Sequence, residues 1–243
     1  MAKILKVRAD FIRVAHAFCY GVTGVFDSAI KQNTLSEASR SVYIEPHPSG
    51  EGVRIVSTDG CAICIQWDRK GYVDRPRLLS GLTHCMVLDF SGTVLDDRWI
   101  EATATDSLTL TRAGKTDIPL AATNVYKAWA NVKGDGTQFP PFGQYVIEPE
   151  NLHNLTRGFP GELNCAYLTL IGRLYEDGLQ NVRTVRVYSH NGDTTLPVVL
   201  HFPWRDYTTV VLAPMKDNPK AWKDVLTDPV MREMAMSDND DDL

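Results

Sequence analysis

The stretch that most constrains how this chain folds is residues 53–67, where two β-rich runs meet at Thr58-Asp59-Gly60. Before the turn, Val53 and Ile55 alternate with Arg54, and a similar alternation follows it, as in strands that present successive side chains to opposite faces. An Asp-Gly pair between two such runs is a strong hairpin signal, because Gly adopts positive φ at no steric cost. The sequence therefore predicts an antiparallel β-hairpin centred on this turn.

The length and composition are those of a globular protein. The chain has 243 residues and 44% of them are hydrophobic, which suits one large domain or two domains of about 120 residues. No apolar run approaches the roughly 18 residues needed to cross a bilayer. Residues 1–8 alternate charged and apolar side chains, whereas a signal peptide has an unbroken apolar stretch. We therefore expect a cytoplasmic protein without a membrane partner.

The charge of the chain argues against DNA binding through a general basic surface. The formal net charge is −5, and such a protein lacks the positive field that attracts a polyanion. The charge is uneven, however, because residues 1–16 carry an excess of Lys and Arg while residues 237–243 contain four Asp and no Lys or Arg. Local basic surface on an acidic body is therefore compatible with the sequence, and the acidic end is expected to be solvated.

The cysteines favour neither disulfides nor a metal site. There are five, an odd number without regular spacing, and each lies within an apolar pattern, as is typical of buried free thiols in a reducing compartment. Cys61 and Cys64 form a C-x-x-C pair, but zinc needs further ligands, and His84-Cys85 is the nearby candidate. Three-residue spacing in a strand also points two thiols to opposite faces. We expect no metal and no cofactor.

One structural unit recurs along the chain. Residues 3–8 form a predicted strand, the apolar spacing after Asp10 predicts a helix capped by Asp10, and three antiparallel strands follow, the last two being the hairpin. Two further occurrences make this typical of an α+β fold built from repeated strand–helix–antiparallel-strand units. The second unit has a predicted helix at 75–82 and strands at 72–73, 85–90, 99–104 and 107–111, and it ends at 118–120; the third has a helix at 150–157 and strands at 144–147, 166–172, 182–188, 196–202 and 207–212.

A segment rich in Gly and Pro divides the chain. Residues 131–143 are hard to build into a helix or a central strand, so we predict a linker there. It separates a first domain at 1–130 from a second domain at 144–216, and short helices with an acidic tail occupy 217–243. The second domain is either abbreviated or holds a fourth half-unit, whose helix would have space only at 172–181.

Two segments resemble one protein family. Residues 55–63, IVSTDGCAI, resemble the hairpin of bacterial DNA polymerase sliding clamps, and residues 206–216, DYTTVVLAPMK, resemble the closing strand of the same proteins. Residues 118–129 are also similar to the end of a clamp domain. The resemblance implies a DNA-clamp-like α+β fold of two domains. That size is closer to viral and eukaryotic-type clamps, which close as trimers, than to three-domain bacterial clamps, and a phage-encoded clamp would fit it.

The resemblance implies a processivity factor rather than an enzyme. Clamps encircle duplex DNA without reading its sequence, so weak positive charge inside the ring suffices, because topology retains the ring. The implied partners are duplex DNA, a DNA polymerase, a clamp loader and further copies of this chain, with a trimer favoured. The implied location is the cytoplasm of a bacterial or phage-infected cell.

Candidate site residues follow from the same resemblance. In clamps the hairpin and the closing strand edge an apolar pocket that accepts short peptides, and an aliphatic pocket with a Met wall can repack around several ligands. Here Cys61-Ala62 stands where the family has His-Arg, and Ala213 stands at its first Met. The implied pocket residues are Thr58, Gly60, Cys61, Ala62, Ile63, Val211, Leu212, Pro214 and Met215. For the DNA-facing side, the sequence nominates Lys6, Arg8, Arg13, His16, Arg75, Arg77 and Arg157, on or beside the predicted helices.

A catalytic constellation is not evident in the sequence. Asp96-Asp97 lies in a predicted turn, Gly134-Asp135-Gly136 lacks the Lys-Ser/Thr of a phosphate-binding loop, and the histidines have no obvious partners. Two alternatives to the clamp stay open. One is a clamp-fold interaction or regulatory protein that does not encircle DNA and uses its acidic tail to bind partners. The other is an enzyme of unrecognised type.

Overall fold

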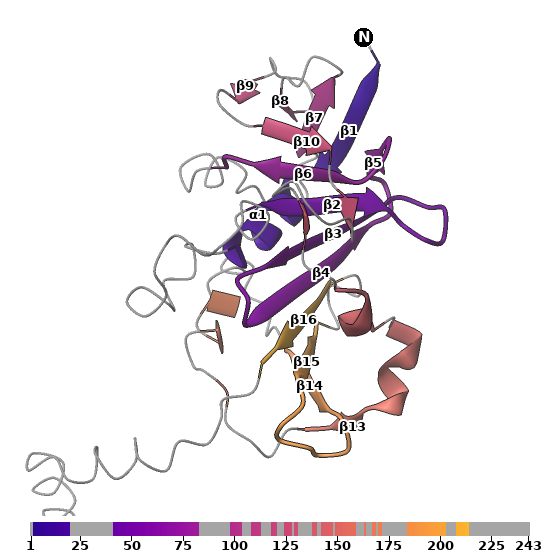
Figure 1. Cartoon of the computed structure of the whole chain (residues 1–243), viewed down its shortest axis with the longest axis vertical. Coiled ribbons are helices and arrows are strands. Elements are labelled where there is room, and N and C mark those ends of the chain that lie inside the picture. The colour runs from indigo at the N-terminus through magenta and orange to yellow at the C-terminus, as the bar shows by residue number, and fades with distance from the viewer. Residues whose placement is uncertain are drawn as a thin grey trace, which may run out of the picture.

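The computed structural model shows an α-helix packed against two large sheets (Figure 1). A five-stranded sheet has the order β5–β1–β7–β8–β9, and a nine-stranded sheet has the order β10–β6–β2–β3–β4–β16–β15–β14–β13. Neighbouring strands in both sheets are antiparallel, whereas β11 and β12 form a separate parallel pair. The structure describes residues 2–19, 41–82, 98–103, 108–112, 118–120, 124–127, 129–130, 138–139, 142–147, 149–158, 163, 167–168, 170–171, 184–202 and 208–213.

Most of the strands are short. The predicted hairpin is confirmed, because β3 and β4 pair antiparallel on either side of the turn. The bounds are β1 Lys3–Arg8, α1 Ala9–Ala17, β2 Val42–Pro46, β3 Val53–Thr58, β4 Ala62–Asp68, β5 Tyr72–Val73, β6 Arg77–Ser80, β7 Arg98–Thr103, β8 Leu108–Arg112, β9 Ile118–Leu120, β10 Asn124–Lys127, β11 Trp129–Ala130, β12 Gln138–Phe139, the 3-10 helices η2 Gly143–Tyr145 and η3 Pro149–Asn154, β13 Thr156–Arg157, β14 Arg186–Ser189, β15 Val198–His201 and β16 Thr208–Leu212.

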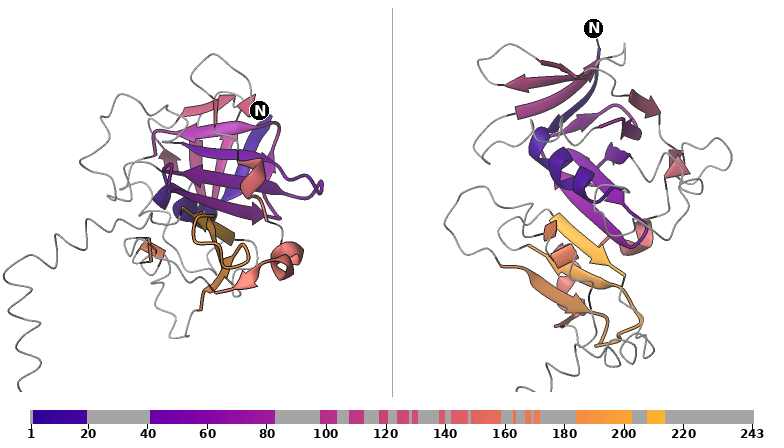
Figure 2. Two further views of the ribbon diagram at one scale, coloured as in Figure 1. Left: turned by 60° about the horizontal axis from the view of Figure 1, so that its bottom comes forward. Right: turned by 90° about the vertical axis from the view of Figure 1, so that its left-hand side faces the viewer.

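Helix α1 lies against strands of both sheets (Figure 2). Its residues Phe11 and Ile12 belong to a buried cluster that also contains side chains of β1, β3 and β7. The prediction that Asp10 caps this helix is wrong, because the N-cap position is Arg8. The backbone N–H of Arg8 donates to Asp68 Oδ2 over 2.9 Å, and Asp10 lies in the first turn, where a carboxylate still offsets the helix dipole.

Pairing between β4 and β16 joins strands from the first third of the chain and from the end of its described part into one sheet. Ala62 to Gln66 pair with Leu212 to Thr208 in antiparallel register. On the α1 side of this junction, Cys64 and Val210 pack with Phe18 of the turn after α1 and with Tyr167. The predicted linker is therefore bridged by direct strand pairing between residues on either side of it. The division into two domains stays a prediction.

The helix predicted at residues 75–82 is wrong, because this segment contains strand β6. The strand lies between β2 and β10. Leu78 packs in the cluster of Tyr43, whereas the next residue, Leu79, packs in the cluster of α1. A strand buried on both faces carries adjacent apolar residues, and over so short a stretch they imitate a helical face.

Three assignments in the third unit also differ from the structure. The strand predicted at 144–147 overlaps 3-10 helix η2, and the helix predicted at 150–157 is 3-10 helix η3 followed by β13. The strand predicted at 166–172 is helical at residues 167, 168, 170 and 171. Short apolar runs do not by themselves distinguish a strand from a buried helix. The strand predicted at 85–90 and the helix considered at 172–181 lie outside the described residues.

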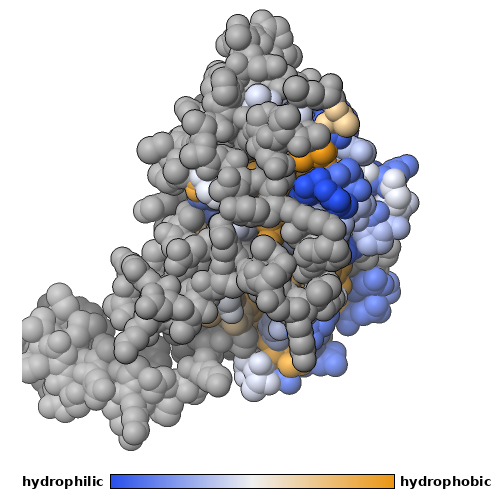
Figure 3. All heavy atoms as spheres, turned by 45° about the horizontal axis from the view of Figure 1, so that its top comes forward, coloured by the Kyte–Doolittle hydropathy of each residue, from blue (hydrophilic) through white to orange (hydrophobic). Residues whose placement is uncertain are grey.

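The described surface is mainly hydrophilic on the face shown in Figure 3, where apolar side chains form small, separate patches. Among the described residues, the large apolar side chains that are exposed belong to different parts of the fold; they are Tyr72, Leu168, Val185 and Leu196. In the part of the chain that the structure describes, no helix is both long and apolar enough to cross a membrane.

Candidate binding pocket

The turn between β3 and β4 is shaped by its own side chains. Asp59 Oδ1 accepts hydrogen bonds from the backbone N–H groups of Cys61 and Ala62, at 2.9 and 2.8 Å. Thr58 Oγ1 donates to the carbonyl of Ala62 over 2.7 Å and accepts from Gly60 N–H over 3.0 Å. Gly60 has a φ of +94°, which favours glycine at this position. The turn therefore fixes the backbone that carries Cys61.

A buried hydrogen bond ties this turn to a helical segment distant in the sequence. Tyr167 Oη donates to Asp59 Oδ2 over 2.7 Å. Burial raises the pKa of the Tyr167 phenol, and the charge and hydrogen bond of Asp59 raise it further. Burial also raises the pKa of the Cys61 thiol, with a smaller contribution from Asp59. The Asp59 carboxylate thus links the turn to the side of the sheet on which α1 lies.

Alternation along β4 and β16 decides which predicted residues face the pocket. Ile63 and Val211 are register partners, and both pack on the side of Tyr145. Ala62 and Leu212 are also register partners, but they belong to the cluster on the α1 side. They support the pocket from behind, because successive residues of a strand point to opposite faces.

The segment from β12 to η2 supplies an aromatic wall. Phe139 stacks on Tyr43 with ring centroids 4.9 Å apart, and Phe142 meets both rings edge to face at 5.4 and 6.0 Å. Each buried Phe stabilises the fold by about 1.5–3 kcal/mol, and each aromatic pair adds about 0.5–1.5 kcal/mol. Tyr145 follows Phe142 by three residues and, like Ile63, packs against the cluster that contains both Phe rings. The predicted linker therefore packs on the nine-stranded sheet at its C-terminal end.

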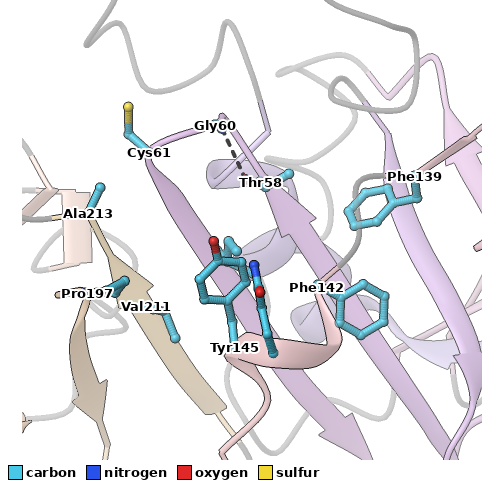
Figure 4. Close-up of a pocket in the computed structure, with 11 residues that line it drawn as sticks. Thr58, Gly60, Cys61, Phe139, Phe142, Tyr145, Pro197, Val211 and Ala213 are labelled. Atoms are coloured by element: carbon cyan, nitrogen blue, oxygen red, sulfur yellow. Dashed lines mark hydrogen bonds between the residues drawn. The ribbon is translucent and has the colours of Figure 1, made fainter. Parts of the chain in front are cut away.

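These elements enclose a pocket of about 300 Å³ beside the hairpin (Figure 4). This volume is at the lower end of the range for small-molecule sites, so it has room for a few side chains. None of its lining residues is charged. The lining residues are Thr58, Gly60, Cys61, Ile63, Phe139, Phe142, Gln144, Tyr145, Pro197, Val211 and Ala213.

The structure brings together most of the described residues that the sequence nominated for the pocket. Thr58, Gly60, Cys61, Ile63 and Val211 line it. Ala62 and Leu212 lie behind it, and Pro214 and Met215 lie outside the described residues.

Sequence reasoning missed the aromatic wall and the roles of Asp59 and Tyr167. A signal for the wall was present, because Phe139-Pro140-Pro141-Phe142 places two large apolar side chains in a segment otherwise rich in Gly and Pro. No local pattern announces the bond between Asp59 and Tyr167, because its partners are 108 positions apart.

The cations nominated to face DNA are mostly held by nearby carboxylates. Hydrogen bonds from Arg77 are the main cause of the lowered pKa of Asp74, so this ion pair persists well below neutral pH. The pairs, with their closest distances, are Lys6–Glu101 at 3.5 Å, Arg8–Asp68 at 2.9 Å, Arg13–Asp10 at 3.0 Å, Arg75–Asp74 at 3.7 Å and Arg77–Asp74 at 2.8 Å.

The residues nominated to face DNA were expected on or beside helices, but the structure places most of them on strands. Of the nominated set, Arg13 and His16 lie on α1, and His16 is buried with Nε2 3.0 Å from the carbonyl oxygen of Leu82. Lys6 lies on β1 between the buried Leu5 and Val7, so it projects from the opposite face of the sheet. Arg77 is buried within β6, and Arg157 is exposed on β13. Whether any of them meets DNA stays a prediction.

The two cysteines of the C-x-x-C pair differ in exposure. Cys61 is partly exposed, lines the pocket and also packs against the α1-side cluster, whereas Cys64 is buried within that cluster. Neither forms a disulfide, and the buried Cys19 does not form one either. Burial is the main cause of the raised pKa of Cys19. Within the described ranges, no group of three or more His, Cys, Asp or Glu side chains is placed to hold a metal ion.

Comparison with known proteins gives matches at the level of structure. No protein-family model matches the sequence, and no curated protein matches it. The DNA polymerase III β subunit of Borrelia burgdorferi, solved with a natural product, is 11% identical with a TM-score of 0.51, over 90% of this chain and 65% of that one. The β subunit of Thermotoga maritima is 9% identical with a TM-score of 0.50, over 93% and 68%. PCNA of A. fulgidus, bound to the C-terminal region of FEN-1, is 11% identical with a TM-score of 0.45, over 89% and 100%.

The two β-subunit likenesses define the class of fold. The sheet-rich α+β architecture of this chain is that of DNA sliding clamps. The chain is accordingly a sliding-clamp-like protein in its fold, and it spans less than two thirds of the Borrelia subunit. The prediction of a clamp-like α+β fold is confirmed at this level.

Proposed function

We propose that this chain is a processivity clamp, which encircles duplex DNA and tethers a DNA polymerase and other replication proteins through the pocket beside the hairpin. The observation that supports this most is the pocket's position in a clamp fold. It lies where the β3–β4 hairpin meets β16, and it is uncharged along its lining. The proposed role is binding rather than catalysis.

The proposed ligand is a short peptide that inserts apolar side chains. The lining combines aliphatic side chains, Ile63 and Val211, with the rings of Phe142 and Tyr145. In Figure 4, Tyr145 lies between Val211 and Phe142. Burying apolar area contributes about 25 cal/mol per Å², from which the loss of translational and side-chain freedom on binding is subtracted. A pocket of this size therefore supports reversible binding, which suits successive exchange of partners.

The proposed ring needs little attraction to DNA, because closure around the duplex retains it. Phosphate contacts would position the duplex without reading its bases. The chain would assemble as a homo-oligomer with a clamp loader opening the ring, and a trimer of two-domain subunits is favoured. Closed rings of identical subunits are a common form of symmetric assembly.

Mass and DNA topology test the proposal together. Light scattering should give a mass of a small whole-number multiple of the 27.1 kDa chain. The assembled protein, loaded on nicked circular DNA, should remain bound and should leave when the circle is cut. A strict monomer, or retention that is equal on circular and linear DNA, would contradict encirclement.

A second candidate function is favoured by the ion pairs. Lys6, Arg8 and Arg77 are engaged by carboxylates, so these three side chains have less positive charge to offer DNA. A clamp-fold regulatory protein that binds replication partners without encircling DNA fits this observation. The same experiment separates the two, because a regulator would bind peptides through the pocket yet show no dependence on DNA topology.

The pocket has its own test. Ile63→Asp places a carboxylate on the apolar wall and should weaken binding of a polymerase tail peptide at least tenfold, because the charge is desolvated there. The mass of the oligomer should not change. Equal binding by this variant would place the partner site elsewhere.

A further inference from the structure

The described chain ends at the pocket itself. Ala213 lines the pocket, and its backbone N–H donates to the carbonyl of Cys61 over 2.7 Å. Residues 214–243 therefore begin from the rim of the cavity. A tethered segment of suitable chemistry would meet the pocket at a high local concentration, about millimolar for a short flexible connection.

One segment beyond Ala213 matches the pocket in chemistry. Trp222, Val225 and Leu226 are spaced i, i+3 and i+4, the spacing that places side chains on one face of a helical turn. The pocket offers aromatic and aliphatic walls and no charged lining residue, so it would accept these side chains and reject the acidic residues at 238–242.

We propose that residues 219–226 occupy this pocket in cis, inserting Trp222 and Leu226, and that partner peptides must displace them. The proposal rests on the proposed function of the pocket as a peptide site. It makes the segment a built-in competitor that tunes how readily partners exchange.

The connection is long enough and favours a reversal of the chain. Five residues, 214–218, separate Ala213 from Pro219, and an extended chain covers about 3.3–3.6 Å per residue. Five residues can therefore span at most about 17–18 Å, which is long enough for the chain to reverse direction beside the cavity. Asn218-Pro219 is a turn-favouring pair at the required place.

The expected effect on partners follows from the tether. If the free segment binds with a dissociation constant of about 100 μM and its local concentration is about 1 mM, the pocket is filled about ten times more often than it is empty. The affinity for a competing peptide is then reduced about tenfold, in proportion to the fraction of empty pockets.

The experiment uses the full chain and a fluorescein-labelled synthetic peptide with the sequence of residues 217–228. Fluorescence anisotropy compares the wild type with the double variant Trp222→Ala and Leu226→Ala. The double variant should bind the probe about tenfold more tightly than the wild type, because its own segment no longer competes. The matched control Lys220→Ala and Lys223→Ala, which alters the same segment but keeps its apolar side chains, should bind as the wild type does.

Pocket variants in the double-variant background locate the binding. Gln144→Lys changes an exposed lining residue, and Tyr145→Ala shortens the aromatic wall; each should weaken the probe several-fold. An absence of probe binding to the double variant, or binding that ignores both pocket changes, overturns the proposal. Relief of competition by Met231→Ala and Met234→Ala, but not by the Trp222 and Leu226 changes, overturns the assignment to residues 219–226.

The two proposals fail in distinguishable ways. If the probe does not bind but a polymerase tail peptide does, the occupant is wrong while the peptide site stands. If the probe binds in the pocket but the protein shows no ring and no topology dependence on DNA, the clamp function is wrong while the cis contact stands.

Discussion

Replacing Tyr167 with Phe tests the buried contact that fixes the pocket's hairpin. Tyr167 Oη donates to Asp59 Oδ2 over 2.7 Å, and the two residues are only 3% and 5% exposed. Removing the hydroxyl leaves a buried carboxylate oxygen without this donor, and a hydrogen bond to a charged group contributes about 1.5–3 kcal/mol. We therefore expect the free energy of unfolding to fall by about 2 kcal/mol, which corresponds to a lower Tm by about 4–8 °C in a chain of this size.

Thermal and urea denaturation followed by far-UV circular dichroism would measure this loss. The matched control is Tyr145→Phe, which makes the same chemical change at a partly exposed ring on the pocket wall. That variant should stay within about 0.5 kcal/mol of the wild type, as surface changes usually do. A Tyr167→Phe variant as stable as this control would refute the contribution assigned to the hydrogen bond.

A double-mutant cycle assigns the loss to the pair rather than to the ring alone. Asp59→Ala removes the acceptor for Tyr167 together with the acceptor for the Cys61 and Ala62 amides, so it should be the more destabilising single change. In the Asp59→Ala background, Tyr167→Phe should cost little, giving a coupling of about 1–2 kcal/mol between the two sites. Additive losses would mean that the Tyr167 hydroxyl stabilises the fold through a contact other than this hydrogen bond to Asp59.

Three further outcomes are expected. The pKa values of Tyr43 and Tyr167 are raised, chiefly by burial. The free energy of unfolding should therefore be unchanged below about pH 10 and should fall as the pH rises further. Denaturation across alkaline pH should show a less steep fall in the Tyr43→Phe variant. Gly52→Ala should destabilise strongly, because its Cβ would meet the backbone of residues 68 and 69, whereas Gly50→Ala at a similar φ meets nothing; urea midpoints compare them. Cys61 should react with iodoacetamide at pH 8 more slowly than a cysteine thiol of ordinary pKa in a short peptide, because the pKa of Cys61 is raised.

The hairpin could be predicted because its signals are local. Strand alternation and the Asp-Gly turn lie within residues 53–67, and the structure places β3 and β4 there with the expected antiparallel pairing. The helix prediction failed at β6 because this strand is buried on both faces, with Leu79 in the cluster of α1 and Leu78 in the cluster of Tyr43. Such burial depends on distant strands, and adjacent apolar residues such as Leu78 and Leu79 do not reveal it.

The pocket was half predictable for a related reason. Alternation along β16 alone would have separated Val211, which lines the pocket, from Leu212, which lies behind it. The resemblance to clamps instead nominated both residues, because it covered the whole segment. The aromatic wall comes from a segment whose Gly and Pro content predicted only a linker. Phe139 and Phe142 anchor this segment on Tyr43 through tertiary contacts, which no periodic pattern in the sequence predicts.

The ion pairs determine what kind of DNA binding this chain can support. A protein that neutralises Z phosphates loses affinity with salt at a slope of about −0.9Z, and a cation already held by a carboxylate contributes less than a free one. Arg8 and Arg77 are held at 2.9 and 2.8 Å, so their contribution to Z should be small. Binding to linear duplex DNA should therefore be weak and only shallowly dependent on salt. Stable retention would then have to come from ring closure, and for this reason DNA topology, rather than affinity, is the property that decides between a clamp and a regulator.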